Sequence, residues 1–148
     1  IREYLTKENI HKYPNLKLLI DDLKTIEIRT KIADLLNIKH VFENSYIRLE
    51  ILNDCDGFWL KKHCDIPEKL ISSLIYVNRT NEDISIGTDF YNQDLKKIKT
   101  FPYLDNVGYI FSGPNKWHGV DKNKKIKVGR TGLQLNYVTF PTDWPVGG

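Results

Sequence analysis

The sequence predicts a mainly β domain with a helical region at its N-terminal end. Apolar residues recur at spacings of three and four between Leu16 and Leu36, which is the period of an amphipathic helix. From residue 41 onward the pattern changes to short alternating or apolar runs separated by turn residues. A helix followed by many short strands is typical of a sandwich, a barrel or a jelly roll with a helical flank.

Length and charge limit the class of protein. The 148 residues, 41% apolar and 28% charged, are enough for one domain with a substantial core. We therefore interpret residues 1–148 as a single domain, with residues 1–40 as the helical flank and residues 41–140 as the β core. Because the chain begins at Ile1 and contains no methionine, we expect the native N-terminus to lie upstream.

The net charge of the chain is +3. Its basic run, Lys122 to Lys127, fits either a solvated turn or a site for an acidic partner.

The helical region leaves one question open. Pro14 suits the first turn of a helix, but the apolar pattern does not decide between one helix and two helices broken near Thr25. In the β region, residues 46–52 alternate most clearly, with Ile47 and Leu49 on the side opposite Arg48. Further strands are expected at residues 58–63, 70–77, 84–91, 107–111, 117–120 and 128–140, and Gly87 indicates a bulge or a close backbone approach.

Cysteine usage and hydropathy bear on the cellular setting. Cys55 and Cys64 belong to no regular framework, which favours a reduced, cytoplasmic protein and leaves a single disulfide open. No run approaches the roughly 20 apolar residues of a membrane helix, and no signal peptide opens the chain. We therefore expect no membrane partner.

One pair of residues has the spacing of metal ligands. His63 and Asp65 lie two positions apart at the end of an expected strand, so both side chains point to the same face. A third ligand, His118, can return on the facing sheet of a jelly roll. Two histidines and one carboxylate form the facial triad that binds non-haem iron(II) with open coordination positions. A His-x-Asp triplet alone is a weak signal, since a surface histidine at a strand end has the same pattern.

A longer series of segments makes the signal specific. The sequence resembles the 2-oxoglutarate-dependent iron(II) dioxygenases, in particular the prolyl-4-hydroxylase-like branch. The resemblance runs in the same order along residues 45–140. The segments that carry it are Gly57-Phe58-Trp59-Leu60-Lys61-Lys62-His63-Cys64-Asp65-Ile66-Pro67, Lys69 to Asn78, Ile86-Gly87-Thr88, Phe111 with Trp117-His118-Gly119-Val120, and Gly129-Arg130-Thr131-Gly132-Leu133-Gln134-Leu135. It implies a double-stranded β-helix, that is, a jelly roll.

The resemblance also implies roles for individual residues. Iron(II) would be bound by His63, Asp65 and His118. Arg130 would pair with the distal carboxylate of 2-oxoglutarate, for which a planar guanidinium is suited, and Tyr76 would donate a hydrogen bond to the same carboxylate. The implied reaction uses O2 and hydroxylates a C–H bond of an unidentified substrate, with release of succinate and CO2.

Further contacts to the cosubstrate are expected from Lys69 and Thr88, and Arg48 and Trp117 could line the pocket. Several of these residues also have an alternative interpretation without a functional role. Arg130 could be a surface arginine, Tyr76 a core residue, Arg48 a solvent-facing side chain and Trp117 a packing residue. His11 and His40 have no partner at ligand spacing, and we interpret both as surface residues.

Two alternative functions remain at this point. A cupin-like metal-binding jelly roll would share the iron ligands but would not use 2-oxoglutarate. A non-catalytic structural or interaction domain would keep the fold alone, although the intact triad and Arg130 argue against it. The substrate could be a small molecule or a peptide, and the modest net charge gives no reason to expect nucleic acid.

Overall fold

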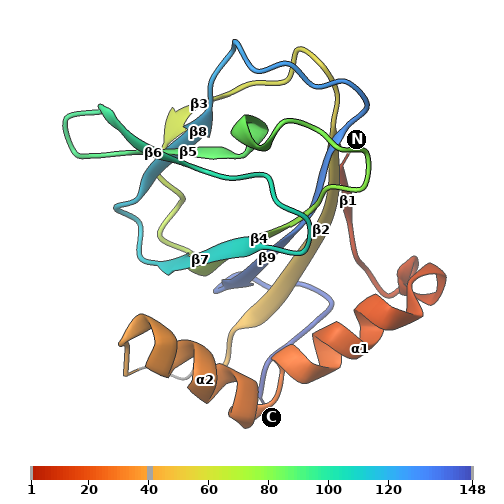
Figure 1. Cartoon of the computed structure of the whole chain (residues 1–148). Coiled ribbons are helices and arrows are strands. Elements are labelled where there is room, and N and C mark those ends of the chain that lie inside the picture. Colours follow the sequence, from red (N-terminus) through yellow and green to blue (C-terminus); the bar gives the residue numbers. More distant parts are fainter. Residues whose placement is uncertain (1, 40–41, 148) are drawn as a thin grey trace.

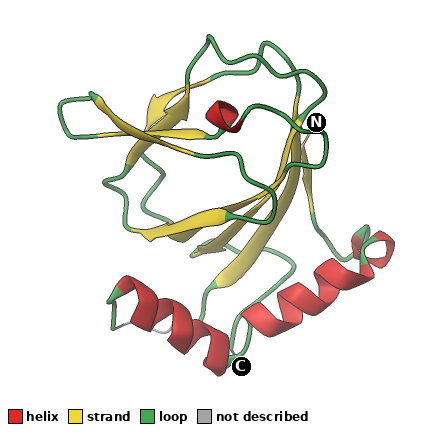
Figure 2. Cartoon of the chain, viewed as in Figure 1, coloured by secondary structure: helices red, strands yellow, loops and turns green. Residues whose placement is uncertain are grey.

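Residues 2–39 and 42–147 are described in a computed structural model, in which two antiparallel β-sheets face each other (Figure 1 and Figure 2). The larger sheet has the strand order β1-β2-β9-β4-β7, and the smaller sheet has the order β3-β8-β5-β6. The strands are β1 (Arg2–Tyr4), β2 (Tyr46–Asp54), β3 (Leu60–His63), β4 (Lys69–Val77), β5 (Thr88–Tyr91), β6 (Lys97–Phe101), β7 (Gly108–Ser112), β8 (Trp117–Val120) and β9 (Arg130–Val138). From β2 onward the chain crosses repeatedly between the two sheets. The predicted mainly β jelly roll is confirmed.

Two strand pairings determine which residues can meet. In the larger sheet, β9 lies between β2 and β4, and its register places Arg130 opposite Asp54. In the smaller sheet, β3 pairs with β8 so that His63 lies opposite His118, with an irregularity between Leu60 and His63. Directly opposed residues of an antiparallel pair point to the same face. Each of these pairings therefore brings two polar side chains together.

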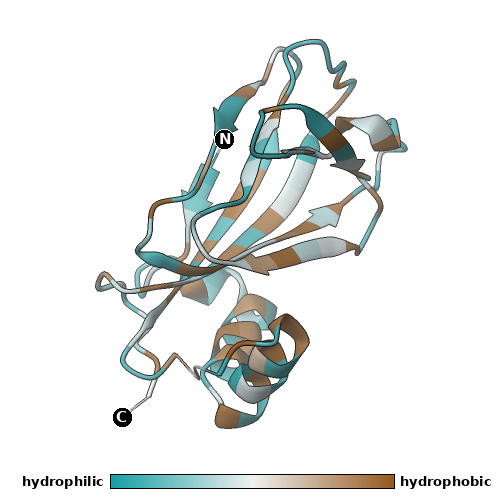
Figure 3. Cartoon of the chain, turned by 90° about the vertical axis from the view of Figure 1, so that its left-hand side faces the viewer, coloured by the Kyte–Doolittle hydropathy of each residue, from teal (hydrophilic) through white to brown (hydrophobic). Residues whose placement is uncertain are grey.

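The larger sheet separates two apolar layers. Ile47 and Leu49 of β2 are fully buried against the helices, in a cluster that includes Ile20. Leu52 and Tyr76 belong to a second cluster, which lies between the two sheets. The hydropathy colouring shows the resulting alternation along the strands (Figure 3). The alternation predicted for residues 46–52 is thus a consequence of one face packing on helices and the other facing the smaller sheet.

The helical region consists of two α-helices, α1 (Pro14–Leu23) and α2 (Ile26–Leu36), preceded by the 3-10 turn η1 (Ile10–Lys12). The break falls at Thr25, which has extended backbone angles and whose hydroxyl accepts a hydrogen bond from the Ile28 amide. Such a side-chain cap starts a new helix. Both helices cover the face of the larger sheet that points away from the smaller sheet (Figure 1).

Three local features differ from the sequence-based expectation. β1 lies within the region expected to be helical, and its three residues pair with β2. β6 was not predicted, because a lysine-rich edge strand lacks the usual apolar alternation. Residues Ile84–Ile86 form the 3-10 turn η2 instead of a strand. The close approach expected at Gly87 is present, because a Cβ there would lie 1.7 Å from the Phe101 carbonyl oxygen.

Two smaller points concern the cellular setting. No helix among residues 2–39 and 42–147 is long and apolar enough to cross a membrane. Cys55 and Cys64 are both free thiols, so the disulfide left open by the sequence is not formed.

Candidate metal centre

The two sheets place three candidate ligands around one point. His63 ends β3, His118 lies on β8, and Asp65 follows β3 by two residues. One ligand atom from each residue lies within 4.8 Å of the other two. Asp65 Oδ1 is 3.4 Å from His118 Nε2 and 3.6 Å from His63 Nε2. The structure therefore brings together the three residues that the sequence singled out as a triad.

Backbone hydrogen bonds orient both imidazole rings. His63 Nδ1 lies 2.8 Å from the carbonyl oxygen of Lys61, and His118 Nδ1 lies 2.8 Å from that of Lys116. A ring that donates its Nδ1–H to a carbonyl keeps the lone pair of Nε2 free. Both Nε2 atoms face the carboxylate of Asp65. This arrangement is typical of histidines that bind metal, in which the second ring nitrogen is fixed by a hydrogen bond.

Asp65 is held in its ionised form. Its carboxylate is buried, and burial alone would raise its pKa, but the adjacent imidazoles of His118 and His63 and the hydrogen bond from Ser72 together lower the pKa far below its ordinary value. The Ser72 hydroxyl donates to Oδ2 over 2.6 Å. Lys69 Nζ lies 3.5 Å from Oδ1, so the lysine that we expected at the cosubstrate contacts the carboxylate ligand. A fixed, charged carboxylate is the form that binds a cation.

The donor set fits iron(II). Two imidazole nitrogens and one carboxylate oxygen, all on one side of a point, correspond to the facial triad, which leaves coordination positions open on the other side. A closed structural zinc site would require a fourth protein ligand, and the described chain groups only these three residues. The geometry therefore favours a catalytic metal over a structural one.

A narrow cavity extends from the triad between the sheets. Its lining includes the three ligands together with Lys69, Thr88, Tyr109, Arg130, Arg2, Gln134, Phe58 and the aliphatic residues Leu52, Leu60, Leu74 and Val120. The metal ligands and Arg130, which lie on different sheets, thus share one cavity.

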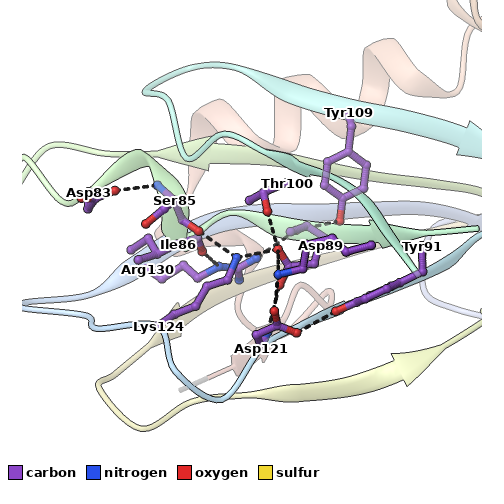
Figure 4. Close-up of polar contacts among 12 residues, drawn as sticks. Asp83, Ser85, Ile86, Asp89, Tyr91, Thr100, Tyr109, Asp121, Lys124 and Arg130 are labelled. Atoms are coloured by element: carbon purple, nitrogen blue, oxygen red, sulfur yellow. Dashed lines mark hydrogen bonds and ion pairs between the residues drawn. The ribbon is translucent and has the colours of Figure 1, made fainter. Parts of the chain in front are cut away.

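Arg130 is buried and held on three sides. Its Nε donates to the Ile86 carbonyl over 2.8 Å (Figure 4), its Nη2 donates to the Thr88 hydroxyl over 3.0 Å, and its Nη1 pairs with Asp54 over 2.8 Å. A guanidinium has five N–H donors. The three contacts with described residues use one N–H donor each from Nε, Nη1 and Nη2. One N–H donor on Nη1 and one on Nη2 therefore remain for a carboxylate ligand. The reading of Arg130 as a surface arginine is wrong, because the residue is only 2% exposed.

Tyr76 does not line the cavity. It is fully buried between the sheets, and its hydroxyl hydrogen-bonds Thr88 Oγ1 over 2.6 Å. Thr88 therefore lies between Tyr76 and the cavity. Tyr109 of β7 lines the cavity instead, and burial raises the pKa of its phenol, so it is a neutral hydrogen-bond donor. Sequence reasoning missed Tyr109 because no local motif marks it.

Two charged residues near Arg130 were also missed. Asp54 is the last residue of β2 and lies between Arg130 and Arg2, whose Nη2 is 3.1 Å from Asp54 Oδ1. Arg2 also pairs with Glu50 over 3.3 Å. Only the register of β9 on β2 could have indicated the Asp54–Arg130 pair, because these residues are far apart in the sequence.

The remaining candidates lie outside the cavity lining. Arg48 stacks over the rings of Tyr4 and Phe140, and Trp117 lines a different groove, on the outer face of the smaller sheet. His11 is exposed, whereas His40 lies outside the described residues.

The basic run after β8 is only partly a solvated turn. Lys124 is folded inward, where its Nζ lies 2.8 Å from the fully buried Asp89 carboxylate and 2.7 Å from the Ser85 carbonyl oxygen (Figure 4). Glu82 accepts hydrogen bonds from the amides of residues 127–129. Both contacts order the segment that leads into Arg130.

Comparisons with known proteins agree with this geometry. No family model and no curated protein matches the sequence. Solved structures do match. A prolyl-4-hydroxylase from Pseudomonas putida has a TM-score of 0.66 at 11% identity, and the match covers 95% of this chain and 72% of that one. A 2OG-Fe(II) oxygenase family oxidoreductase from Burkholderia pseudomallei has a TM-score of 0.64 at 14% identity, with coverages of 89% and 62%.

A prolyl 4-hydroxylase from Phytophthora capsici has a TM-score of 0.67 at 16% identity, with 97% of this chain and 49% of that chain covered. The chain has the fold of the 2OG-Fe(II) oxygenases. The family resemblance seen in the sequence is thus confirmed at the level of the fold. The chain spans less than two thirds of the length of two of these three structures.

Proposed function

We propose that this protein is an iron(II)- and 2-oxoglutarate-dependent oxygenase that hydroxylates a C–H bond of a small molecule or a peptide. The observation that supports this most strongly is the single cavity shared by the triad and Arg130. His63, Asp65 and His118 would hold the iron. Arg130 would bind the distal carboxylate of 2-oxoglutarate, and Thr88 and Tyr109, which line the same cavity, would hydrogen-bond it.

The charges of the cavity support the same ligand pair. Arg2, Lys69 and Arg130 line the cavity, and they are balanced by the carboxylates of Glu50, Asp54 and Asp65. Iron(II) adds two positive charges, and 2-oxoglutarate brings two negative ones. The filled site thus has the same net charge as the protein alone, which avoids the cost of an uncompensated buried charge.

The protein residues have distinct tasks in this proposal. When bound, iron and 2-oxoglutarate supply the oxidising chemistry, in which O2 is consumed and succinate and CO2 are released. Ser72 and the two backbone carbonyls fix the ligand side chains, while Tyr76 holds the hydroxyl of Thr88. Leu52, Leu74 and Val120 exclude water from the space between the sheets. Since both cysteines are free, we also propose a reducing, cytoplasmic setting.

A second candidate function is a cupin-like metal-binding protein that does not use 2-oxoglutarate. One observation favours it: Arg130 already has a carboxylate partner in Asp54. If that pair persists, the arginine has a structural role and the cavity serves the metal alone.

Anaerobic titration with iron(II) and 2-oxoglutarate separates the two functions. The oxygenase proposal predicts the weak visible charge-transfer band of a chelated iron complex, which Arg130→Ala should weaken and His118→Ala should abolish. Iron binding without the band would favour the cupin-like alternative. Absence of iron binding would show that the assignment of the metal centre is wrong.

A further inference from the structure

A second cavity lies on the other side of the two strands that carry the histidines. It is an open groove of about 480 Å³ lined by Trp59, Leu60, Lys61, Lys62, Leu95, Trp117, Val120, Asp121 and Lys122. Trp117 directly precedes His118 on β8, and neighbouring residues of a strand point to opposite faces. The groove therefore lies on the outer face of the smaller sheet.

The groove and the metal cavity share a wall. Leu60 and Val120 line both spaces and are direct partners in the pairing of β3 with β8. Lys62 of the groove is adjacent in sequence to His63 of the triad. A ligand in the groove would therefore contact the same strands that hold the metal ligands.

The apolar residues of the groove are unusually exposed. Trp59 is 45% exposed, Leu60 41% and Leu95 40%. Isolated exposed apolar residues are common on protein surfaces, but a contiguous apolar patch with a polar rim marks an interaction site. Here the three residues line one groove with Trp117.

The rim carries positive charge without internal compensation. Among residues 2–39 and 42–147, no carboxylate lies within ion-pair distance of Lys61, Lys62 or Lys122. The one acidic lining residue, Asp121, is engaged by Lys97 and by the Tyr91 hydroxyl. The groove thus presents an apolar floor and three lysines that have no carboxylate partner among the described residues. Two of them contact neighbouring groups: Lys62 Nζ donates to the Leu95 carbonyl oxygen over 3.1 Å, and Lys122 Nζ lies 4.3 Å from the centroid of the Trp59 ring.

We propose that this groove binds an acidic peptide segment, with an apolar side chain packed between Trp59 and Trp117 and flanking carboxylates on the lysines. The chemistry of the floor and the rim is complementary to such a segment. An open groove suits an extended chain, and β3 is the edge of its sheet, where backbone groups can pair with a peptide.

Two features argue against single-stranded nucleic acid as the ligand. Stacking of successive bases requires a series of aromatic faces, but the groove lining contains two aromatic residues, Trp59 and Trp117. The net charge of +3 is also small for a nucleic-acid surface. A rival structural explanation is that the lysines only protect an edge strand from aggregation.

Tryptophan fluorescence tests the proposal directly. The probe is a short capped peptide with a leucine flanked on each side by glutamates, compared with the same peptide carrying glutamines or lysines. Trp59 and Trp117 should report binding, whereas Trp144, the third tryptophan, is buried near Leu5. We expect saturable binding of the glutamate peptide, with about tenfold weaker binding of the glutamine peptide.

The variant Lys61→Glu/Lys122→Glu should weaken binding of the glutamate peptide by about tenfold or more. Lys31→Glu is the matched control, because it reverses an exposed lysine on α2 and should leave binding unchanged. Trp59→Ala, at an exposed position, should weaken binding without any change of charge. Comparison of thermal unfolding with the wild-type protein tests whether each variant is folded.

Several results would overturn the proposal: no binding of the glutamate peptide, equal binding of all three peptides, or unchanged binding by the double variant. Tighter binding of an oligothymidine that is sensitive to the same lysines would assign the groove to nucleic acid instead. Concentration-dependent self-association that blocks the peptide would assign it to a second copy of the chain. None of these measurements requires iron, so the groove and the proposed oxygenase activity can fail independently.

Discussion

The ion pair between Asp54 and Arg130 predicts that one substitution, Asp54→Asn, lowers the stability of the protein and raises its affinity for 2-oxoglutarate. Both side chains are 3% exposed, and their atoms lie 2.8 Å apart. Loss of one partner of a buried ion pair costs about 3–5 kcal/mol. Asp54→Asn keeps the shape and one acceptor, so we expect about 3 kcal/mol at the lower end of that range. Arg2 adds little, since it is 36% exposed. The melting temperature should fall by about 10 °C.

The same change should strengthen binding of 2-oxoglutarate. In Asp54→Asn the charge of Arg130 is no longer balanced, and a carboxylate ligand restores the balance. We expect about tenfold tighter binding to the metal-loaded protein, equivalent to about 1.4 kcal/mol. Urea unfolding with and without 2-oxoglutarate measures both effects, because a ligand stabilises the state that binds it.

A matched control is Asp21→Asn, which removes a carboxylate from an exposed pair with Lys17 and should change stability by less than about 0.5 kcal/mol. If Asp54→Asn is as stable as this control, the buried pair does not stabilise the protein. If stability and 2-oxoglutarate affinity fall together, Asp54 positions Arg130 for the ligand, and the reasoning about competition is refuted.

Three further predictions concern stability and metal affinity. Ser72→Ala removes the 2.6 Å hydrogen bond to Asp65 and should weaken metal binding by about 10–100-fold, measured by equilibrium dialysis. Gly87→Ala places a Cβ within 1.7 Å of a backbone oxygen and should lower the free energy of unfolding by about 4 kcal/mol. Gly113→Ala has open space around the new Cβ and a φ of +85°, so it should lower the free energy of unfolding by about 1 kcal/mol. Urea unfolding of both variants measures the difference. Glu82→Gln should cost about 2 kcal/mol at pH 7, because Glu82 accepts three backbone hydrogen bonds. Burial would raise the pKa of Glu82, but the backbone hydrogen bonds lower it below its ordinary value of 4.5. The contribution of Glu82 to stability is therefore complete above about pH 4.5 and is lost as the pH falls through the lower pKa of the folded state. A wild-type profile of stability against pH identical to that of the glutamine variant would contradict this.

Local patterns were sufficient for most of the fold and for the pair of His63 and Asp65. The alternation at residues 46–52 predicted β2, because one face of that strand packs on helices. His63 and Asp65 lie on one face for the same geometrical reason, and the family resemblance supplied His118 and Arg130. A local pattern also revealed the close approach at Gly87.

The rest depends on contacts that no local pattern contains. The pairing of Asp54 with Arg130 follows from the register of β9 on β2, which is set by packing along the whole length of both strands. Tyr76 and Tyr109 both point between the sheets, and only the position of Thr88 decides which of them reaches the cavity. β1 and β6 are edge strands, so neither shows the pattern of a buried strand.

The most direct test of the account is whether metal and 2-oxoglutarate occupy the cavity together. Calorimetric titration of 2-oxoglutarate under anaerobic conditions, with and without iron(II), measures this coupling. Because the cosubstrate would bridge the triad and Arg130, we predict tight binding only when iron is present, and loss of that binding in Arg130→Ala. Binding that is equally tight without iron, or absent although iron is bound, would contradict the account.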